Sequence, residues 1–268
     1  MATEAPQFTQ RRAAPKISEA VRNQDVNWDL FDSSAYWEAN YKSLRDDDQQ
    51  ILSIMEDFFT QLPPESRAKG VDVGPGANLY PALAMLPFCE EIVLWEHSAA
   101  NVRWLRGELR SFRSTWDPFW RLVTRARRSW FGEEVPEGAI DPRSMLARVA
   151  EVRQGSVFDL PEAAFDVGTM FFVAESLTED PKEFELATKR FVASLKPGAP
   201  FAAAFMEQSG GYDVGGYRFP AVPITIEDVE KCLQDIVDKP QVQPVASQKP
   251  LREGYSGGMI LALGRAGK

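Results

Sequence analysis

Two glycines that flank a single proline, Gly74 and Gly76, follow a short apolar run that contains Asp72. The segment over residues 71–81 reads VDVGPGANLYP, a pattern typical of a buried strand that turns tightly into a helix. Glycine adopts positive φ easily and has no Cβ, so backbone N–H groups in such a turn can approach a ligand closely. These residues predict a ligand-binding loop, and the alternative is a tight turn that binds nothing.

An acidic residue, Glu96, follows the next apolar run, about 20 residues after this loop, where a carboxylate can accept hydrogen bonds from a ribose diol. A dinucleotide-binding turn has a third glycine at the position that Leu79 occupies here. S-adenosylmethionine has no phosphate and needs less room at that position. It is therefore the favoured ligand, and His97, the only histidine, is expected at the rim of its site rather than as a catalytic base.

The composition argues against several other classes of function. With 268 residues, 44% of them hydrophobic, and a net charge of −9, the chain can bury a full core and does not have the charge of a nucleic-acid binder. Two cysteines and one histidine leave no basis for a disulfide framework, a metal site or a Ser/His/Asp triad. No long apolar run or signal-like segment is present. We expect a cytoplasmic protein, a monomer or weak homodimer, that binds a small molecule but neither nucleic acid nor membranes.

Strand and helix patterns alternate along most of the chain. Strands are expected at residues 71–73, 91–96, 149–153, 165–172 and 201–206, and helices at 79–86, 98–112, 116–128, 181–195 and 225–237. Ser98 and Thr225 are the expected caps of two of these helices. Residues 131–144 are expected to form a loop, and the last strands, 241–248 and 257–265, suit an antiparallel pair at a sheet edge. This order predicts an α/β fold with a Rossmann-like, doubly wound sheet of seven strands.

The N-terminal part of the chain differs in pattern. Residues 1–27 have no apolar period and are expected to be a flexible tail, which leaves a single domain over residues 28–268. Apolar spacing over residues 34–62 predicts a helix that is capped by Ser33 or Ser34 and broken near residues 45–48. This helix would form an N-terminal helical cap over residues 28–69, while residues 206–223 would form a hairpin on the substrate side.

These segments together resemble the nicotinamide/phenylethanolamine/thioether (indolethylamine) N-methyltransferase-like family of class I S-adenosylmethionine-dependent methyltransferases. The resemblance rests on YWEANYKSL, VDVGPGANLYP, IVLWEHSAANVRWL, TWDPFW, SLKPGAPF and YDVGGYRF, which occur in this order. It implies methyl transfer from S-adenosylmethionine, with S-adenosylhomocysteine as product, to an amine or heteroaromatic nitrogen of a small molecule. O- or S-methyl transfer, an NAD-type oxidoreductase and a non-catalytic binding protein of the same fold remain alternatives.

The resemblance also implies roles for individual residues around the cofactor. Tyr36 and Tyr41 would close over the cofactor and the pocket. Three further groups would line the methionine part, hold the ribose and flank the adenine; these are Gly74, Pro75 and Tyr80, then Glu96 and Asn101, then Ser156 and Val157. Asp72, Gly76, His97 and Phe172 complete the predicted cofactor site.

The acceptor is expected near the ends of the fourth and fifth strands. Glu207 follows the fifth strand, and we predict that it contacts the acceptor as a catalytic residue, with Tyr36 and Glu175 close to it and Tyr212 at the start of the glycine-rich hairpin. A carboxylate beside the methylated nitrogen would favour the positive charge that forms there. The alternative for Glu207 is an ordinary solvated residue at the end of a strand.

Overall fold

The computed structural model describes residues 20–60, 68–130, 141–247, 255 and 257–267. One sheet has the strand order β3-β2-β1-β4-β5-β9-β8, and a separate hairpin pairs β6 with β7. The strands are β1 (Ala68–Val73), β2 (Cys89–Glu96), β3 (Ala150–Gln154), β4 (Val167–Phe171), β5 (Pro200–Met206), β6 (Tyr212–Val214), β7 (Tyr217–Phe219), β8 (Val237–Val245) and β9 (Met259–Ala266). The first five strands of the main sheet are parallel, whereas β9 is antiparallel to both β5 and β8. The predicted doubly wound sheet with an antiparallel edge pair is confirmed.

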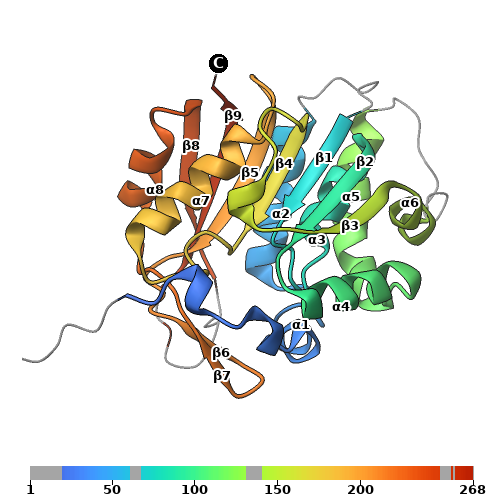
Figure 1. Ribbon diagram of the computed structural model, residues 1–268. Helices are drawn as coiled ribbons and strands as arrows, with labels where there is room; N and C mark the ends of the chain where they lie inside the picture. The colour runs from blue at the N-terminus through green and yellow to red at the C-terminus, as the bar shows by residue number, and fades with distance from the viewer. Residues whose placement is uncertain (1–19, 61–67, 131–140, 248–254, 256, 268) are drawn as a thin grey trace, which may run out of the picture.

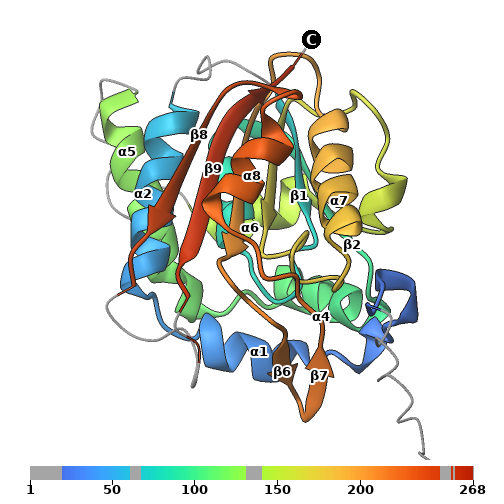
Figure 2. The same ribbon diagram turned by 90° about the vertical axis from the view of Figure 1, so that its left-hand side faces the viewer.

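Helices cover both faces of this sheet, as Figures 1 and 2 show. The helices are α1 (Ser33–Asn40), α2 (Asp46–Phe59), α3 (Tyr80–Met85), α4 (Ala99–Arg110), α5 (Asp117–Trp130), α6 (Pro142–Val149), α7 (Pro181–Ala193) and α8 (Ile226–Leu233). Short 3-10 turns are η1 (Asn23–Asp25), η2 (Trp28–Leu30), η3 (Ser114–Trp116) and η4 (Val157–Asp159). Helix α1 and the β6–β7 hairpin lie beyond the carboxyl ends of the parallel strands, where this fold class binds its ligands.

The alternation of side chains along the strands produces two cores. Ile92 and Leu94 of β2 face one core, which contains apolar residues of α2, α3 and α5. Val93, the residue between them, and Val71 of β1 face the other core, which contains residues of α7 and α8. Because both faces of the parallel strands are covered, these strands carry nearly continuous apolar runs.

Local capping chemistry sets several helix starts. The Ser98 side chain accepts hydrogen bonds from two amides of the first turn of α4, and Thr225 caps α8, so both predicted caps are confirmed. The expected cap of α1, Ser33 or Ser34, was wrong. Asp32 caps this helix, because its carboxylate accepts hydrogen bonds from the Ser34 and Ala35 amides. The N-terminal helix is broken at residues 41–45, slightly before the predicted residues 45–48, because residues 46–48 already form the first turn of α2.

The expected loop over residues 131–144 was wrong in its last part. Asp141 accepts hydrogen bonds from the amides of Arg143 and Ser144 and so caps α6, and Pro142 occupies the first turn. An aspartate followed by proline is a helix-start signal that the sequence did contain. Residues 131–140 of that expected loop lie outside the described residues.

The expected flexible tail was also wrong at its end. The Val21 amide donates to Glu179, and the Asn23 amide donates a 2.9 Å hydrogen bond to Glu183 at the start of α7. Residues 20–27 are thus held by polar contacts with a distant part of the chain, which an apolar periodicity cannot reveal. Residues 1–19 lie outside the described residues.

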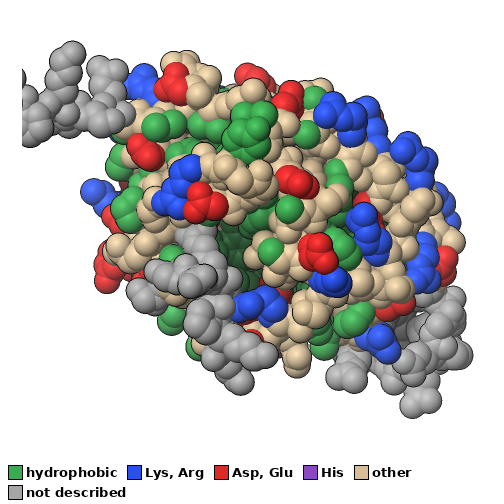
Figure 3. Space-filling view, turned by 90° about the horizontal axis from the view of Figure 1, so that it is seen from below, with side chains coloured by type: hydrophobic (Ala, Val, Ile, Leu, Met, Phe, Trp, Pro, Cys, Tyr) green, Lys and Arg blue, Asp and Glu red, His purple; other side chains and the backbone are tan. Residues whose placement is uncertain are grey.

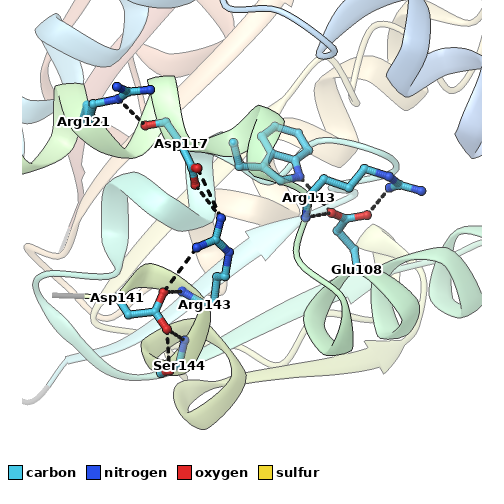
Figure 4. Close-up of polar contacts among 8 residues, drawn as sticks. Glu108, Arg113, Asp117, Arg121, Asp141, Arg143 and Ser144 are labelled. Atoms are coloured by element: carbon cyan, nitrogen blue, oxygen red, sulfur yellow. Dashed lines mark hydrogen bonds and ion pairs between the residues drawn. The ribbon is translucent and has the colours of Figure 1, made fainter. Parts of the chain in front are cut away.

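Polar contacts among α4, α5 and α6 fix the helices next to the N-terminal segment (Figure 4). Arg143 of α6 donates to Asp117 at the start of α5, with a distance of 3.0 Å between Nη2 and Oδ1. The buried carboxylate of Glu108 accepts from the Arg113 guanidinium and from Nε1 of Trp116. The Trp116 ring in turn packs against Tyr41, so this network supports one wall of the site described next.

Candidate active site

A cavity of about 560 Å³ lies at the carboxyl ends of β1, β2 and β4. The loop after β1, the end of β2 and the turn after β3 form its floor, while α1, η2 and the β6–β7 hairpin contribute residues to its roof. Figure 3, which views the molecule from below relative to Figure 1, shows a hollow on this face with hydrophobic side chains in its depth. Its volume suits a small organic ligand.

The loop after β1 has the backbone that the two glycines predict. Gly74 and Gly76 have φ values of 63° and 57°, in the left-handed region that favours glycine. A Cβ on Gly74 would lie 2.7 Å from a methyl group of Val173, just after β4. The Gly74 amide donates to the backbone oxygen of Trp95, so the loop is held between the ends of β2 and β4.

Glu96 is the buried acid at the end of β2, with 4% of its surface exposed. Its Oε2 accepts a 2.9 Å hydrogen bond from the Gly76 amide, and its Oε1 accepts from the Ser98 amide and from Nδ2 of Asn101. Burial raises the pKa of Glu96, and these hydrogen bonds oppose the rise. A carboxylate has about four acceptor sites, so a ligand hydroxyl can still bind to it.

The turn after β3 forms the end of the cavity beyond Glu96. Ser156 and Val157 line it together with the ring of Trp95, whose Nε1 donates to the Ser156 backbone oxygen. Gly155 is required there, because a Cβ would lie 2.5 Å from the Trp95 ring. His97 is exposed and lines the cavity at this end.

Aromatic side chains lead from the roof into the core. The Tyr36 and Tyr41 rings are 5.9 Å apart, and those of Tyr41 and Tyr80 are 6.0 Å apart. Phe31 packs against Tyr36 from the N-terminal segment, and Tyr212 of the hairpin stacks on Phe219. Burial raises the pKa values of Tyr41 and Tyr80, so both phenols are neutral hydrogen-bonding groups at physiological pH.

Most of the predicted site residues line this one cavity. They are Tyr36, Tyr41, Gly74, Pro75, Gly76, Glu96, His97, Asn101, Ser156, Val157, Phe172 and Tyr212. Phe172 has a φ of 60°, an unusual conformation for a bulky residue that is often found at functional sites. Asp72, Tyr80, Glu175 and Glu207 are not among the described residues that form the cavity wall.

Asp72 and Glu175 are buried beneath the cavity. Oδ1 of Asp72 accepts a 2.8 Å hydrogen bond from the hydroxyl of Thr169 on β4, and burial raises the pKa of Asp72 to about 8. Oε1 of Glu175 accepts from the Met206 amide and from the Ser176 hydroxyl. Both side chains therefore support the strands that carry the site rather than line the cavity.

Glu207 differs from its predicted position because of strand alternation. Met206, the last residue of β5, lines the cavity. Because successive side chains of a strand point to opposite faces of the sheet, the Glu207 side chain does not line it. The Glu207 amide donates to the backbone oxygen of Gly258, and Oε2 lies 3.5 Å from the position of a Cβ on that glycine. The structure thus places Glu207 against the start of β9 and outside the described cavity wall, and its contact with an acceptor stays a prediction.

The sequence reasoning missed several residues that line the cavity. They are Trp28, Phe31, Arg45, Asp48, Met206, Asp213 and Met259. Asp48 is the most unusual of them, because it is a carboxylate with only 1% of its surface exposed. Its signal was an acidic run, residues 46–48, which is common at the start of a helix and so does not indicate a site by itself.

Comparisons with known proteins agree with this geometry. The profile of the NNMT/PNMT/TEMT family matches residues 19–250. An indolethylamine N-methyltransferase of Mus musculus is 23% identical over 172 residues, which are 62% of this chain. That match spans 64% of the length of the mouse protein.

Solved structures share the fold at low sequence identity. The N-methyltransferase NodS of Bradyrhizobium japonicum, in complex with S-adenosylhomocysteine, has a TM-score of 0.52 and 13% identity, and the match covers 92% of this chain and 98% of NodS. A 1,6-didemethyltoxoflavin-N1-methyltransferase of Burkholderia thailandensis has a TM-score of 0.51 and 15% identity, with 88% and 85% of the two chains covered. No helix in the described part of the chain is long and apolar enough to cross a lipid bilayer.

Proposed function

This chain belongs to the NNMT/PNMT/TEMT family of S-adenosylmethionine-dependent methyltransferases, and we propose that it methylates a nitrogen atom of a small amine or heteroaromatic acceptor. The observation that carries the proposal is the hydrogen bond between the Gly76 amide and Glu96. It places a carboxylate beside a glycine loop at the carboxyl ends of two adjacent strands, which is the arrangement that an adenosyl ligand requires.

The chemistry of the cavity wall fits S-adenosylmethionine. Glu96 and Asn101 would hold the ribose hydroxyls, and Ser156 and Val157 would flank the adenine. The glycine loop would lie along the methionine part, in space that a side chain on Gly74 would disturb through its contact with Val173. The position of a third glycine in dinucleotide-binding loops is occupied by the fully buried Leu79, which does not favour a pyrophosphate there.

Bound S-adenosylmethionine supplies an electrophilic methyl group on a sulfonium, so the protein needs neither a metal nor a strong acid for the transfer. The task of its residues is to align the acceptor and exclude water. Tyr36, Phe31 and Tyr212 line the cavity from α1, the N-terminal segment and the hairpin. These aromatic rings would cover the reacting atoms and limit the directions from which an acceptor can approach.

The lining of the cavity supports an amine rather than an anionic acceptor. Arg45 is the one Lys or Arg side chain among its described lining residues, and its guanidinium is bonded to Asp47. The aromatic rings of the roof can stabilise a cation. An amine nitrogen becomes positively charged as it is methylated, and an aromatic lining favours that charge.

A binding measurement followed by an acceptor screen tests the proposal. Isothermal titration of the protein should detect S-adenosylhomocysteine but not NAD. Mass spectrometry should then detect a methyl group from S-adenosylmethionine on at least one member of a panel of primary amines and pyridines, but not on matched phenols, alcohols or thiols. Binding of NAD alone would contradict the cofactor, and methylation confined to oxygen or sulfur acceptors would contradict the nitrogen assignment.

A further inference from the structure

Two buried polar side chains at the cavity each have one atom without a hydrogen-bond partner. Asp48 and Asn78 both line the cavity, with 1% and 4% of their surfaces exposed. Among the described residues, neither Oδ2 of Asp48 nor Nδ2 of Asn78 has a hydrogen-bond partner. Buried polar atoms are normally paired, so two such atoms in one cavity wall indicate a ligand that pairs with them.

Tyr80 shows that these two side chains are neighbours. Its amide donates a 3.0 Å hydrogen bond to Oδ1 of Asn78, which orients the Asn78 side chain. Burial raises the pKa of the Tyr80 phenol, Asp48 raises it further and Asn78 opposes the rise, so the phenol lies within interaction range of both. The unpaired atoms of Asp48 and Asn78 therefore belong to one polar patch.

This patch lies on the methionine side of the cavity. Asn78 is in the loop after β1 and accepts from the amide of Tyr80, which the family resemblance places at the methionine part. The ribose and adenine residues, Glu96 and Ser156, are on β2 and after β3, on the opposite side of β1 from β4. An adenosyl ligand bound at Glu96 would thus extend its amino-acid end toward Asp48.

The two unpaired atoms have opposite hydrogen-bonding character. An ionised carboxylate only accepts hydrogen bonds, and an amide NH₂ group only donates them. A zwitterionic amino acid offers the matching groups, an ammonium that donates and a carboxylate that accepts. We propose that Asp48 binds the α-ammonium group of S-adenosylmethionine and that Asn78 donates to its α-carboxylate; this inference rests on the proposed function for the identity of the cofactor.

The charged and titratable groups around Asp48 leave its carboxyl group available to bind an ammonium. The Arg45 guanidinium is bonded to the buried carboxylate of Asp47, at 2.9 Å between Nη2 and Oδ2, and so it neutralises Asp47. Burial, and secondarily Asp47, raise the pKa of Asp48 to about 8, while Arg45 and Tyr80 oppose the rise. Tyr41 is the other titratable side chain coupled to Asp48, and it stays neutral. An ammonium at this position would lower the pKa of Asp48 and pair with its ionised form.

Three adenosyl ligands separate the contribution of the ammonium from that of the rest of the cofactor. S-adenosylhomocysteine has both charged groups, its des-amino analogue keeps only the carboxylate, and 5′-methylthioadenosine has neither. Isothermal titration of wild type should give an affinity for S-adenosylhomocysteine at least tenfold above that for the des-amino analogue. Asp48→Asn should remove most of this preference and leave the affinity for 5′-methylthioadenosine within about twofold of wild type.

Asp46→Asn is the matched control, because Asp46 also lies in the first turn of α2 but not in the cavity wall. It should keep the wild-type preference. Asp48→Asn with an unchanged preference, or with equal losses for all three ligands, would overturn the inference while the proposed function stands. Failure of wild type to bind any adenosyl ligand would overturn both.

Wild type alone gives a second readout, which does not depend on the folding of a variant. Because burial raises the pKa of free Asp48 to about 8 and an ammonium opposite it would lower that pKa, binding of S-adenosylhomocysteine at pH 7 should release close to one proton. Titrations in two buffers of different ionisation enthalpy measure that number. Equal proton release by S-adenosylhomocysteine and by its des-amino analogue would contradict the assignment.

Discussion

The amide of Gly76 donates a 2.9 Å hydrogen bond to Oε2 of Glu96, which joins the loop after β1 to the last residue of β2. The same carboxylate accepts from the Ser98 amide at the start of α4. The loop after β1 and the turn from β2 to α4 are therefore fixed around one buried acid before any ligand binds. Such preorganisation reduces the ordering cost of binding, and it makes Glu96 the residue on which cofactor affinity should depend most directly.

Glu96→Ala should weaken binding of S-adenosylhomocysteine by about 1.5–3 kcal/mol, the range for hydrogen bonds to a charged group. Part of this loss would arise because the Gly76 and Ser98 amides lose their acceptor. Glu96→Gln would keep only part of these hydrogen bonds. Isothermal titration measures the change. Glu91→Ala serves as the control, because Glu91 is on the same strand and pairs with Lys69 away from the cavity. Equal affinities of Glu96→Ala and wild type would contradict the ribose assignment.

Gly74→Ala should impair both stability and cofactor binding, because it adds a Cβ at positive φ that would lie 2.7 Å from Val173. Gly198→Ala separates the two effects, since Gly198 also has positive φ but no atom within 4 Å of its added Cβ. The backbone strain should cost each variant about 1–2 kcal/mol in urea unfolding. Only Gly74→Ala should lose affinity for S-adenosylhomocysteine, and Val173→Ala in the same chain should restore part of it.

The sequence allowed most of the fold to be predicted, because local rules decided it. Ser98 and Thr225 cap their helices where short-range hydrogen bonding predicts, and the apolar runs marked the buried strands. The burial of individual polar residues could not be predicted from such local rules. Asp48 belongs to an acidic run that is favourable at any helix start, and only the packing of α2 against the sheet makes its carboxylate a buried one.

Two further differences from the sequence predictions have different origins. Val21 is held by Glu179, which is 158 residues further along the chain, so no local pattern could predict that the segment is docked. Glu207 was predicted to contact the acceptor because it follows a strand. The position after a strand does not fix the phase of side-chain alternation, and in β5 this phase puts Met206 rather than Glu207 in the cavity wall.

Asp72 should make stability fall with rising pH, in addition to Asp48, whose pKa burial also raises to about 8. Burial raises its pKa to about 8 in the folded state, whereas an unfolded aspartate ionises near pH 4, at about 3.9. Between these pH values the folded state keeps a proton that the unfolded state has lost, so the free energy of unfolding decreases as pH rises. The slope for one such group is at most about 1.4 kcal/mol per pH unit.

Asp72→Asn should therefore reduce this slope between pH 5 and about 8, as measured by urea unfolding of the ligand-free protein at several pH values. The amide oxygen can still accept from Thr169, which preserves the contact with β4. Asp166→Asn is a suitable comparison, since Asp166 pairs with Lys196 at a more exposed position. Parallel curves for wild type and Asp72→Asn would show that Asp72 is already ionised in the folded protein.

Glu175 and Glu207 should respond differently to substitution. Glu175→Ala leaves the Met206 amide and the Ser176 hydroxyl without their acceptor, which should cost about 1–3 kcal/mol of stability. Glu207→Ala should change neither stability nor affinity for S-adenosylhomocysteine by more than about 0.5 kcal/mol. Once an acceptor is found, single-turnover methyl transfer by Glu207→Gln should stay within about twofold of wild type. A loss of about tenfold or more would place Glu207 at the acceptor, as the sequence predicted.

Helix α1 should become less mobile when the cofactor binds. Tyr36 lines the cavity from this helix, and the Ser33 hydroxyl donates a 2.6 Å hydrogen bond to Oδ1 of Asn101 beside Glu96. A ligand that contacts Glu96 and Tyr36 would connect the floor of the site to its roof, and closure of such a segment excludes water. Hydrogen exchange of the amides in α1 should slow on addition of S-adenosylhomocysteine, while exchange in α8, which packs away from the cavity, should not change.

Ser33→Ala should reduce the protection of α1 in the complex, because it removes the one side-chain hydrogen bond between α1 and Asn101 in the described residues. Unchanged exchange in α1 at saturating ligand would show that this helix is a fixed wall rather than a lid.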